Sequence, residues 1–333
     1  MTSAIGILGT GAYLPAREVG NDELAALVPD TTAEWILRKT GIRSRRYAAP
    51  DEAASDLAAG AARAALADAG LTADRVDHII VCTSTGDQPL PPTASVVQQL
   101  LGAGSAACFD LNAVCAGFVY GLEAARGLIA VRPGAHVLLI GADVYSRFLD
   151  FTDRRSAVLL GDGAGAVVVG AVEEGHGILG IDLSTRGDAQ DLLRIPAGGS
   201  RSPASAGTVA EGGHHLRMQG RAVSEFVLEN IPPGVDKLLA GAGVRAEEID
   251  CFVPHQANGV LIRELAARCG LAGTPLVQVV ETYGNTGAAS VPIGLDHAVR
   301  EGTVEPGGLV LLSAFGAGMS VGNGLLRWGG GPA

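Results

Sequence analysis

Short apolar segments alternate with alanine-rich stretches along the whole chain. The apolar segments are rich in Val, Ile and Leu and are bounded by Gly, Asp and Ser, which is typical of strands buried on both faces of a sheet. The pattern predicts strands at 3–14, 77–85, 106–112, 135–143, 156–172, 177–185, 249–257, 275–281, 308–316 and 322–329. Helices are expected at 219–241, at 258–269 and near 287–301. The alternation of strands and helices predicts an α/β fold built in layers.

The order of these elements indicates that the chain consists of two similar halves. In the first half a strand and Asn112 precede an alanine-rich helix that holds Cys115, and in the second a strand and Asn285 precede another helix. We therefore expect two structural units, formed by residues 1–172 and 173–333.

One segment of the second half lacks this regularity. Residues 186–218 are rich in Gly, Ser, Asp and His and form the longest stretch without a clear period. Long irregular segments in compact domains are often functional. We expect a surface excursion close to a site.

Composition narrows the class of protein. The chain has 333 residues, of which 47% are hydrophobic and 18% charged. This is far from the composition of a disordered chain, and the length corresponds to about two domains. The 48 glycines stand in short separate clusters, which predicts many tight turns. A net charge of −11 argues against a general binder of nucleic acids or of anionic membranes.

The ends of the chain and its cysteines indicate a cytoplasmic protein. The first residues lack a basic segment followed by a long apolar one, so no secretory signal is visible. Residues 306–326 carry no charge but contain six glycines, and we expect two buried strands there rather than a membrane span. Five cysteines without a CxxC pair disfavour both a disulfide framework and a zinc site.

Three polar residues are candidates for chemistry. Asn112 is placed to cap the helix that follows, so Cys115 is expected in its first turn, where free backbone N–H groups favour a thiolate. His255 follows an apolar strand, and Asn285 stands between a strand and a helix. Each also has a purely structural interpretation: a buried cysteine, which we assign to the other four, a hydrogen-bonded histidine, or a turn asparagine. Together they form a plausible set for acyl transfer from thioesters.

Around these residues the sequence resembles the ketoacyl-acyl-carrier-protein synthase III family, which has the thiolase fold. The resemblance covers nearly the whole chain and rests on six ordered motifs: AEWILRKTGIRSRRYAAPDE (33–52), DLNAVCAGFVYGL (110–122), FTDRRSAVLLGDGAGAVVV (151–169), VPHQAN (253–258), ETYGNTGAAS (281–290) and LLSAFGAGMSVG (311–322). It implies two pseudo-duplicated βαβαβαββ-type halves layered α-β-α-β-α, a homodimer with a shared sheet, and a triad of Cys115, His255 and Asn285.

The resemblance also implies a reaction. The Cys115 thiolate takes an acyl group from an acyl thioester, while the backbone N–H groups of Cys115 and Ala317 hold the oxyanion. A malonyl thioester then loses carbon dioxide, His255 and Asn285 stabilise the enolate, and the carbanion attacks the acyl-enzyme. Coenzyme A thioesters are substrates, and no metal or redox cofactor is expected. The GTGAYL segment at 9–14 lacks the third glycine of a dinucleotide loop.

Binding residues follow from the same resemblance. Trp35 and Arg154 would flank the adenine of coenzyme A, Lys39 would lie on its phosphates, and Asn258 would contact the pantetheine arm. Leu90 matches the position at which the partner subunit closes the acyl pocket. Residues 38–46 hold five basic side chains in nine, which suits phosphates.

Two positions depart from the family pattern. Val260 and Glu225 stand where fatty-acid-synthesis members carry basic residues that dock an acidic carrier protein. This puts use of a carrier protein in doubt, although Arg221 and Arg263 are nearby candidates for compensation. We expect a synthase of polyketide or other secondary metabolism, or one that starts fatty acid synthesis.

Other functions stay open from the sequence. The same fold could move an acyl group from Cys115 to an alcohol or amine, or condense two acyl chains without decarboxylation. A non-catalytic partner subunit would be expected to lack the thiol or its donors, and this sequence holds both.

Overall fold

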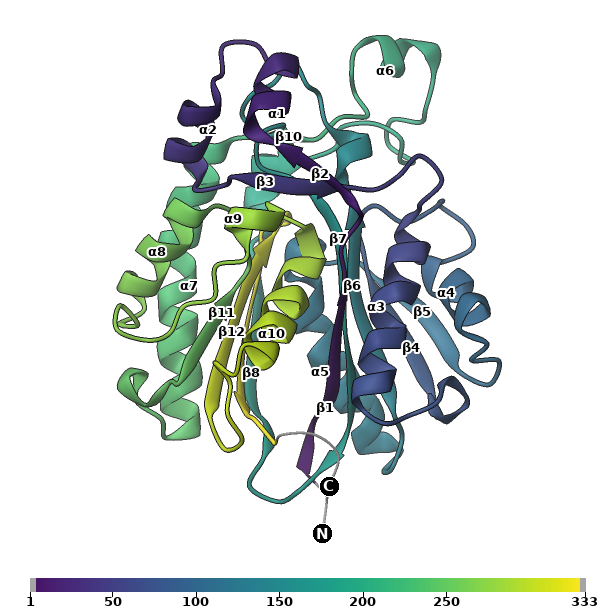
Figure 1. Cartoon of the computed structure of the whole chain (residues 1–333), viewed down its shortest axis with the longest axis vertical. Coiled ribbons are helices and arrows are strands. Elements are labelled where there is room, and N and C mark those ends of the chain that lie inside the picture. Colours follow the sequence, from purple (N-terminus) through teal and green to yellow (C-terminus); the bar gives the residue numbers. More distant parts are fainter. Residues whose placement is uncertain (1–3, 330–333) are drawn as a thin grey trace.

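Two β-sheets form the centre of the molecule, and helices cover and separate them (Figure 1). The structure is a computed structural model that describes residues 4–329. The first sheet has the order β1 (Ala4–Tyr13), β7 (Asp162–Val172), β6 (Val137–Val144), β4 (His78–Cys82) and β5 (Ala107–Leu111). The second has the order β11 (Cys251–Pro254), β12 (Leu309–Gly316), β13 (Ser320–Arg327) and β8 (Gly177–Thr185). All strands of the first sheet thus precede residue 173, and all strands of the second follow it.

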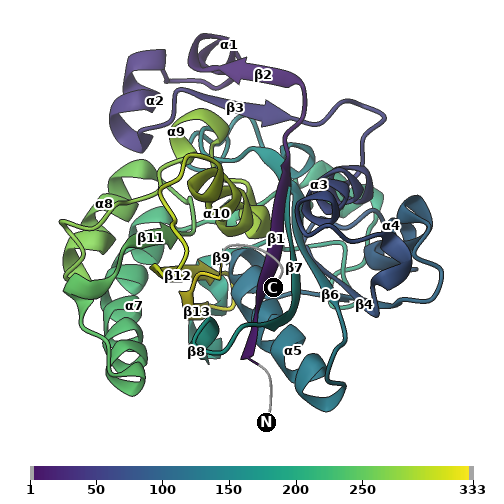
Figure 2. The ribbon, with the colours of Figure 1, turned by 60° about the horizontal axis from the view of Figure 1, so that its bottom comes forward.

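The helices complete five layers. Helices α3 (Ala54–Asp68) and α4 (Thr93–Leu101) cover the outer face of the first sheet, and α7 (Gly220–Ala242) and α8 (Gly259–Arg268) pack outside the second. Between the sheets lie α5 (Gly117–Val131) and α10 (Ser290–Arg300), which contact both (Figure 2). This order confirms the expected thiolase-like α-β-α-β-α fold.

Smaller elements surround the layers. Two short strand pairs are β2 (Arg17–Gly20) with β3 (Ser44–Tyr47) and β9 (Leu193–Arg194) with β10 (Arg217–Met218). Short helices are α1 (Asn21–Leu27), α2 (Ala33–Thr40), α6 (Ala206–Ala210) and α9 (Val280–Tyr283). Short 3₁₀-helices are η1 (Ala73–Arg75), η2 (Val114–Ala116), η3 (Tyr145–Phe148), η4 (Gly187–Leu192), η5 (Ala246–Glu248) and η6 (Gly287–Ala289).

Glycines within strands let the helices approach the first sheet closely. A Cβ on Gly11 would lie 2.3 Å from the backbone nitrogen of Ala65 in α3, and one on Gly165 would lie 2.6 Å from that of Ile293 in α10. Backbone cannot yield at such distances, so a side chain at either position would push the layers apart. Part of the high glycine content therefore serves layer packing, in addition to the turns that composition predicts.

Helix α5 is the central core helix. With the turn before it, Val114–Val131 is the single helical stretch within residues 4–329 that is long and apolar enough to cross a membrane. Its residues Phe118, Val119 and Leu122 are fully buried in the cluster between the two sheets. The apolar face of this helix is thus already covered by protein. Residues 306–326 form most of β12 and β13, as expected.

Two predicted strands were wrong in part. The first, 156–172, begins only at Asp162. The second, 275–281, makes one isolated bridge at Leu276 and then turns into α9. The Gln256 side chain explains this: its Nε2 donates to the Val277 carbonyl at 3.0 Å and its Oε1 accepts from the Val280 N–H at 3.0 Å. A side chain therefore satisfies backbone groups that a neighbouring strand would otherwise have paired.

Candidate active site

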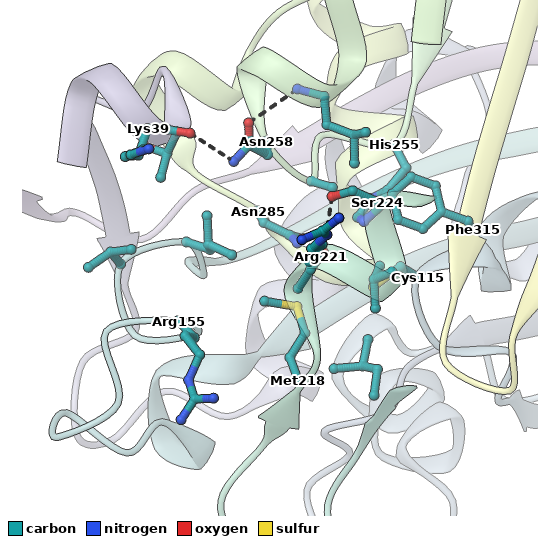
Figure 3. Close-up of a pocket in the computed structure, with 18 of the residues that line it drawn as sticks. Lys39, Cys115, Arg155, Met218, Arg221, Ser224, His255, Asn258, Asn285 and Phe315 are labelled. Atoms are coloured by element: carbon teal, nitrogen blue, oxygen red, sulfur yellow. Dashed lines mark hydrogen bonds between the residues drawn. The ribbon is translucent and has the colours of Figure 1, made fainter. Parts of the chain in front are cut away.

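A cavity of about 570 Å³ lies where chain segments from both halves meet (Figure 3). Cys115 precedes α5, His255 follows β11, and Asn285 precedes η6 and α10, and all three line this cavity. So do four of the residues expected to bind coenzyme A, namely Trp35, Lys39, Arg154 and Asn258. Ala317 and Leu90 are not among its lining residues.

Cys115 lies in the turn η2, between β5 and α5. Helix α5 itself begins at Gly117 and has no side-chain cap, so the expectation that Asn112 caps it was wrong. The Asn112 Oδ1 instead accepts from the Val114 N–H at 3.1 Å, which supports a turn where Val114 has a φ of 51°. A β-branched residue rarely adopts this conformation. The turn places Cys115 on the cavity, two residues before the helix begins.

The resting state of Cys115 also differs from the expectation. Burial raises the pKa of its thiol, and the buried carboxylate of Asp143 raises it further, whereas a hydrogen bond from Tyr145 and the cysteine's own backbone N–H oppose the rise. A helix N-terminus stabilises a nearby anion by up to about 2 kcal/mol, while full burial shifts a pKa by as much as about 3–5 units. Desolvation is therefore the larger effect, and the sulfur rests as a thiol that ionises in a minor fraction of molecules.

This raised pKa predicts how alkylation of Cys115 depends on pH. Only the thiolate reacts with iodoacetamide, and its fraction grows about tenfold per pH unit below the pKa, so the rate should rise without a plateau from about pH 6 to about pH 8.5. Peptide mass mapping of the Cys115 adduct over time measures this rate. A plateau below neutral pH would show that the thiolate is already the resting form.

The end of β12 lies directly against the cysteine turn. A Cβ on Gly316 would lie 2.7 Å from the Cys115 nitrogen and 2.9 Å from the Ala113 carbonyl oxygen. Only glycine permits this approach of two backbones. The segment that continues through Ala317 is thereby held beside the backbone N–H of Cys115.

His255 is buried with one of its ring nitrogens occupied. Its Nδ1 is 2.6 Å from the Ser290 Oγ, and its ring packs edge-on to Phe315 with centroids 5.0 Å apart. Burial lowers the pKa of His255 to about 3. At neutral pH the ring is therefore an uncharged imidazole, which can donate one hydrogen bond and accept one.

Asn285 is oriented by its own loop. Its Oδ1 accepts from the Gly287 N–H at 3.0 Å, and its backbone pairs with Leu159 and Gly161 at 2.9 Å each. The side-chain Nδ2 is thus left to donate toward the cavity. The neutral His255 ring and the Asn285 amide thus line the same cavity as Cys115.

Asp143 is a supporting residue that the sequence did not reveal. Its carboxylate accepts from the Ala288 N–H at 2.8 Å, and on the other oxygen from Ser84 and Thr85. It thereby ties the loop of Asn285 to the first sheet. Burial raises its pKa, while these hydrogen bonds lower it. A carboxylate that ends the apolar run of β6 was the signal that could have identified it.

The residues at the cavity mouth are already engaged with one another. The Arg154 guanidinium lies 5.2 Å from the centre of the Trp35 ring and donates to the Asp30 carbonyl at 2.8 Å. The Asn258 Oδ1 caps α8, and its Nδ2 donates to the Lys39 carbonyl at 3.3 Å. One amide hydrogen of Asn258 remains for a ligand.

A second cavity of about 30 Å³ extends from Cys115 and Asn285. Tyr145 and several apolar residues line it, and three of these, Leu193, Leu216 and Met218, belong to the irregular segment 186–218. The expected surface excursion therefore helps to shape the site.

The two positions that depart from the family pattern lie near the mouth. Val260 is 43% exposed on the first turn of α8. Glu225 forms an exposed ion pair with Arg221 at 2.8 Å, and Arg263 donates to Gln278. Both arginines named as candidates for compensation thus have partners within the chain.

The layered fold, the cysteine before the central helix and the His and Asn side chains that the other half brings to the same cavity define a thiolase-fold condensing enzyme. Comparison with known proteins specifies the family. The family model for 3-oxoacyl-[acyl-carrier-protein (ACP)] synthase III matches residues 109–187, and the model for the C-terminal part of that enzyme matches residues 239–328. The chain belongs to the 3-oxoacyl-[acyl-carrier-protein] synthase III family.

Curated relatives align over nearly their whole length. The chain is 49% identical to acetoacetyl CoA synthase NphT7 of Streptomyces sp. strain CL190, over 97% of this chain and 98% of that one. It is 44% identical to the beta-ketoacyl-[acyl-carrier-protein] synthase III of Caldanaerobacter subterraneus subsp. tengcongensis, over 98% of each.

Solved structures agree with the fold. The 3-oxoacyl-[acyl-carrier-protein] synthase III of Aquifex aeolicus VF5 has a TM-score of 0.89 at 37% identity, covering 98% of this chain and 100% of that one. The priming beta-ketosynthase of the R1128 polyketide biosynthetic pathway has a TM-score of 0.91 at 34% identity, covering 98% and 97%. The chain is therefore an acyltransferase of the β-ketoacyl synthase III kind, which joins an acyl group to a malonyl thioester by decarboxylative Claisen condensation.

Proposed function

We propose that this enzyme transfers a short acyl group from acyl-CoA to Cys115 and condenses it with malonyl-CoA to give a 3-oxoacyl-CoA. The observation that carries the proposal is the convergence of Cys115, His255 and Asn285 on one cavity whose extension beyond the cysteine measures about 30 Å³. Space of this size admits one or two water-sized groups, which suits an acyl chain of a few carbons.

In the first half-reaction Cys115 is the nucleophile. Its sulfur forms a bond to the thioester carbonyl carbon, the bond from that carbon to the CoA sulfur breaks, and the thiol proton ends on the released CoA. The backbone N–H groups of Cys115 and Ala317 are the proposed oxyanion donors, and the close approach of Gly316 to the cysteine turn supports this placement. The product is an acyl-enzyme.

In the second half-reaction His255 and Asn285 hold the malonyl thioester by its carbonyl oxygen. The bond to the carboxylate breaks, carbon dioxide leaves, and the electron pair moves into an enolate whose oxygen accepts from both side chains. The enolate carbon attacks the acyl-enzyme carbonyl, and the Cys115 thiolate leaves and takes a proton from solvent. Two neutral donors suit this oxygen because they require no counter-charge in a buried site.

The choice of CoA as carrier rests on two observations. The two positions beside the mouth at which the family pattern has basic docking residues hold the uncharged Val260 and the acidic Glu225, so neither offers positive charge to an acidic carrier protein. The relative named acetoacetyl CoA synthase, at 49% identity, carries a CoA product in its name. Both favour coenzyme A for the extender as well as for the acyl donor.

The carrier preference predicts a gain of function at Val260. We expect Val260→Arg to raise kcat/KM for malonyl-carrier protein several-fold at low ionic strength and to lose that gain at high salt. The rate with malonyl-CoA should stay within about twofold, since exposed substitutions are usually neutral. Steady-state kinetics with both extenders measures the effect.

Val131→Arg is the matched control. Val131 is 88% exposed at the opposite end of α5 from the cavity, so the same change of charge there should leave the carrier preference unchanged. An equal gain in both variants, or none in either, would contradict docking of a carrier protein beside Val260.

The proposal includes a homodimer that acts in the cytoplasm. Strand β5 lies at the edge of the first sheet, and Leu90 is 84% exposed, which supports a homodimer in which each subunit's Leu90 closes the other's acyl pocket. We also propose that the enzyme acts in the cytoplasm and requires no resident metal or redox cofactor. Backbone and side-chain donors supply the charge stabilisation that both half-reactions need.

Intact-protein mass spectrometry tests the proposed function. The enzyme is incubated with acetyl-, butyryl-, hexanoyl- and octanoyl-CoA, and the expected result is an adduct with the shortest donors that vanishes in Cys115→Ala. Adding malonyl-CoA should then release a 3-oxoacyl-CoA two carbons longer than the donor. Absence of any adduct, or adducts with the longest donors only, would overturn the proposal.

A further inference from the structure

The hydroxyl of Ser290 lies behind the catalytic histidine. Ser290 is fully buried as the first residue of α10. Its Oγ accepts from the Gln256 N–H at 3.2 Å and is 2.6 Å from the His255 Nδ1. The contact with the histidine is the shorter of the two, and it occupies Nδ1, so Nε2 is the ring nitrogen left for the cavity.

The hydrogen count in this pair determines the tautomer. A serine hydroxyl carries one hydrogen, and the Gln256 N–H already occupies the oxygen as an acceptor. Within residues 4–329, Ser290 Oγ makes two hydrogen bonds, and it is the acceptor in the one from Gln256. Its own hydrogen therefore has one acceptor, the His255 Nδ1. The ring is neutral and carries a single proton, so an accepting Nδ1 places that proton on Nε2.

We propose that Ser290 is a positioning residue that donates to the His255 Nδ1 and keeps the ring in the Nε2–H tautomer, the form that can donate to the carbonyl oxygen of a malonyl thioester. The inference rests on the proposed role of His255. In the opposite tautomer Nε2 would present a lone pair to the enolate oxygen, and the two would repel. Phe315, packed edge-on to the ring, holds its plane in place.

The two half-reactions should depend on Ser290 to different degrees. Acylation of Cys115 relies on the sulfur and on backbone N–H groups, whereas decarboxylation relies on the His255 donor. Loss of the hydroxyl should therefore slow malonyl-CoA decarboxylation and spare acylation. A purely structural role in holding α10 would slow both together.

The experiment compares Ser290→Ala with Ser290→Thr in the full-length enzyme. We expect alanine to slow decarboxylation of malonyl-CoA about 10- to 100-fold, less than complete loss of one preorganised donor can cost, with acylation by acetyl-CoA within about threefold. Threonine, which keeps the hydroxyl, should restore most of the rate. Ser313→Ala is the matched control, because its buried hydroxyl donates to Asn323 instead of to the histidine.

Nitrogen NMR of ¹⁵N-histidine-labelled enzyme reads the tautomer directly. The His255 signals, identified by their absence in His255→Ala, should show a protonated Nε2 in the wild type and a mixture of tautomers in Ser290→Ala. A protonated Nδ1 in the wild type would overturn the inference, even if the alanine variant does not fold. Equal loss of acylation and decarboxylation would also overturn it, as would an unchanged decarboxylation rate. A wrong proposed function would give a different result: if His255 has no role in decarboxylation, the His255→Ala variant decarboxylates malonyl-CoA at the wild-type rate.

Discussion

Replacing Cys115 with alanine is expected to lower the condensation rate by roughly 10⁴-fold or more, which is typical when an enzyme loses its nucleophile. No other described cysteine lines the large cavity, so no neighbour can take over the acyl group. His255 and Asn285 stay in place, and the variant should still release carbon dioxide from malonyl-CoA. Product formation and carbon dioxide release, measured on the same sample, separate the two activities.

Cys108→Ala serves as the control for this variant. Cys108 is only half-buried, on the edge strand β5, and is outside both cavities near Cys115. Its replacement should leave condensation within about twofold, as for most substitutions away from a site. Residual condensation in Cys115→Ala at more than a tenth of the wild-type rate would contradict covalent catalysis by this sulfur.

Changing Asn285 to aspartate is expected to slow malonyl-CoA decarboxylation about 10²- to 10³-fold, the usual cost of removing one preorganised oxyanion donor. Aspartate keeps an oxygen that can accept from the Gly287 N–H, so the loop should hold its shape. The Nδ2 donor is replaced by a second, negatively charged oxygen that repels the enolate. Acylation of Cys115 should fall much less, and stopped-flow acylation with acetyl-CoA measures it separately.

Asn258→Asp makes the same chemical change at the cavity mouth. Aspartate still caps α8, so the helix should be unaffected, and only the hydrogen bond to the Lys39 carbonyl is lost. Aspartate also lacks the amide hydrogen that Asn258 has free for a ligand, so we expect a higher KM for acyl-CoA with kcat largely kept. If Asn285→Asp behaved like Asn258→Asp, Asn285 would not be a donor to the enolate.

The layered fold was predictable because buried strands and alanine-rich helices leave strong local patterns. The segment 275–281 carried the same pattern, but it pairs with β11 only around Leu276, because the Gln256 side chain then binds the Val277 carbonyl and the Val280 N–H. Hydrophobicity reports burial well, but it does not report which group satisfies the backbone.

Part of the candidate site was likewise predictable from the sequence, and part was not. Cys115, His255 and Asn285 could be predicted because they lie in motifs that resemble those of a known family, and the structure places all three on one cavity. The ionisation of Cys115 could not be derived from its position before a helix, because burial and Asp143 come from elements remote in sequence. Ser290 is the last residue of the motif ETYGNTGAAS, and only the fold shows that it lies against His255.

The most direct test of the account is a single-turnover chase. Enzyme is loaded with ¹³C-acetyl-CoA, freed of excess donor, and mixed with unlabelled malonyl-CoA while adduct, carbon dioxide and products are followed by mass spectrometry. The account predicts that the labelled adduct on Cys115 disappears at the rate at which labelled acetoacetyl-CoA and carbon dioxide form, in equal amounts. A labelled adduct that persists while product accumulates would contradict it.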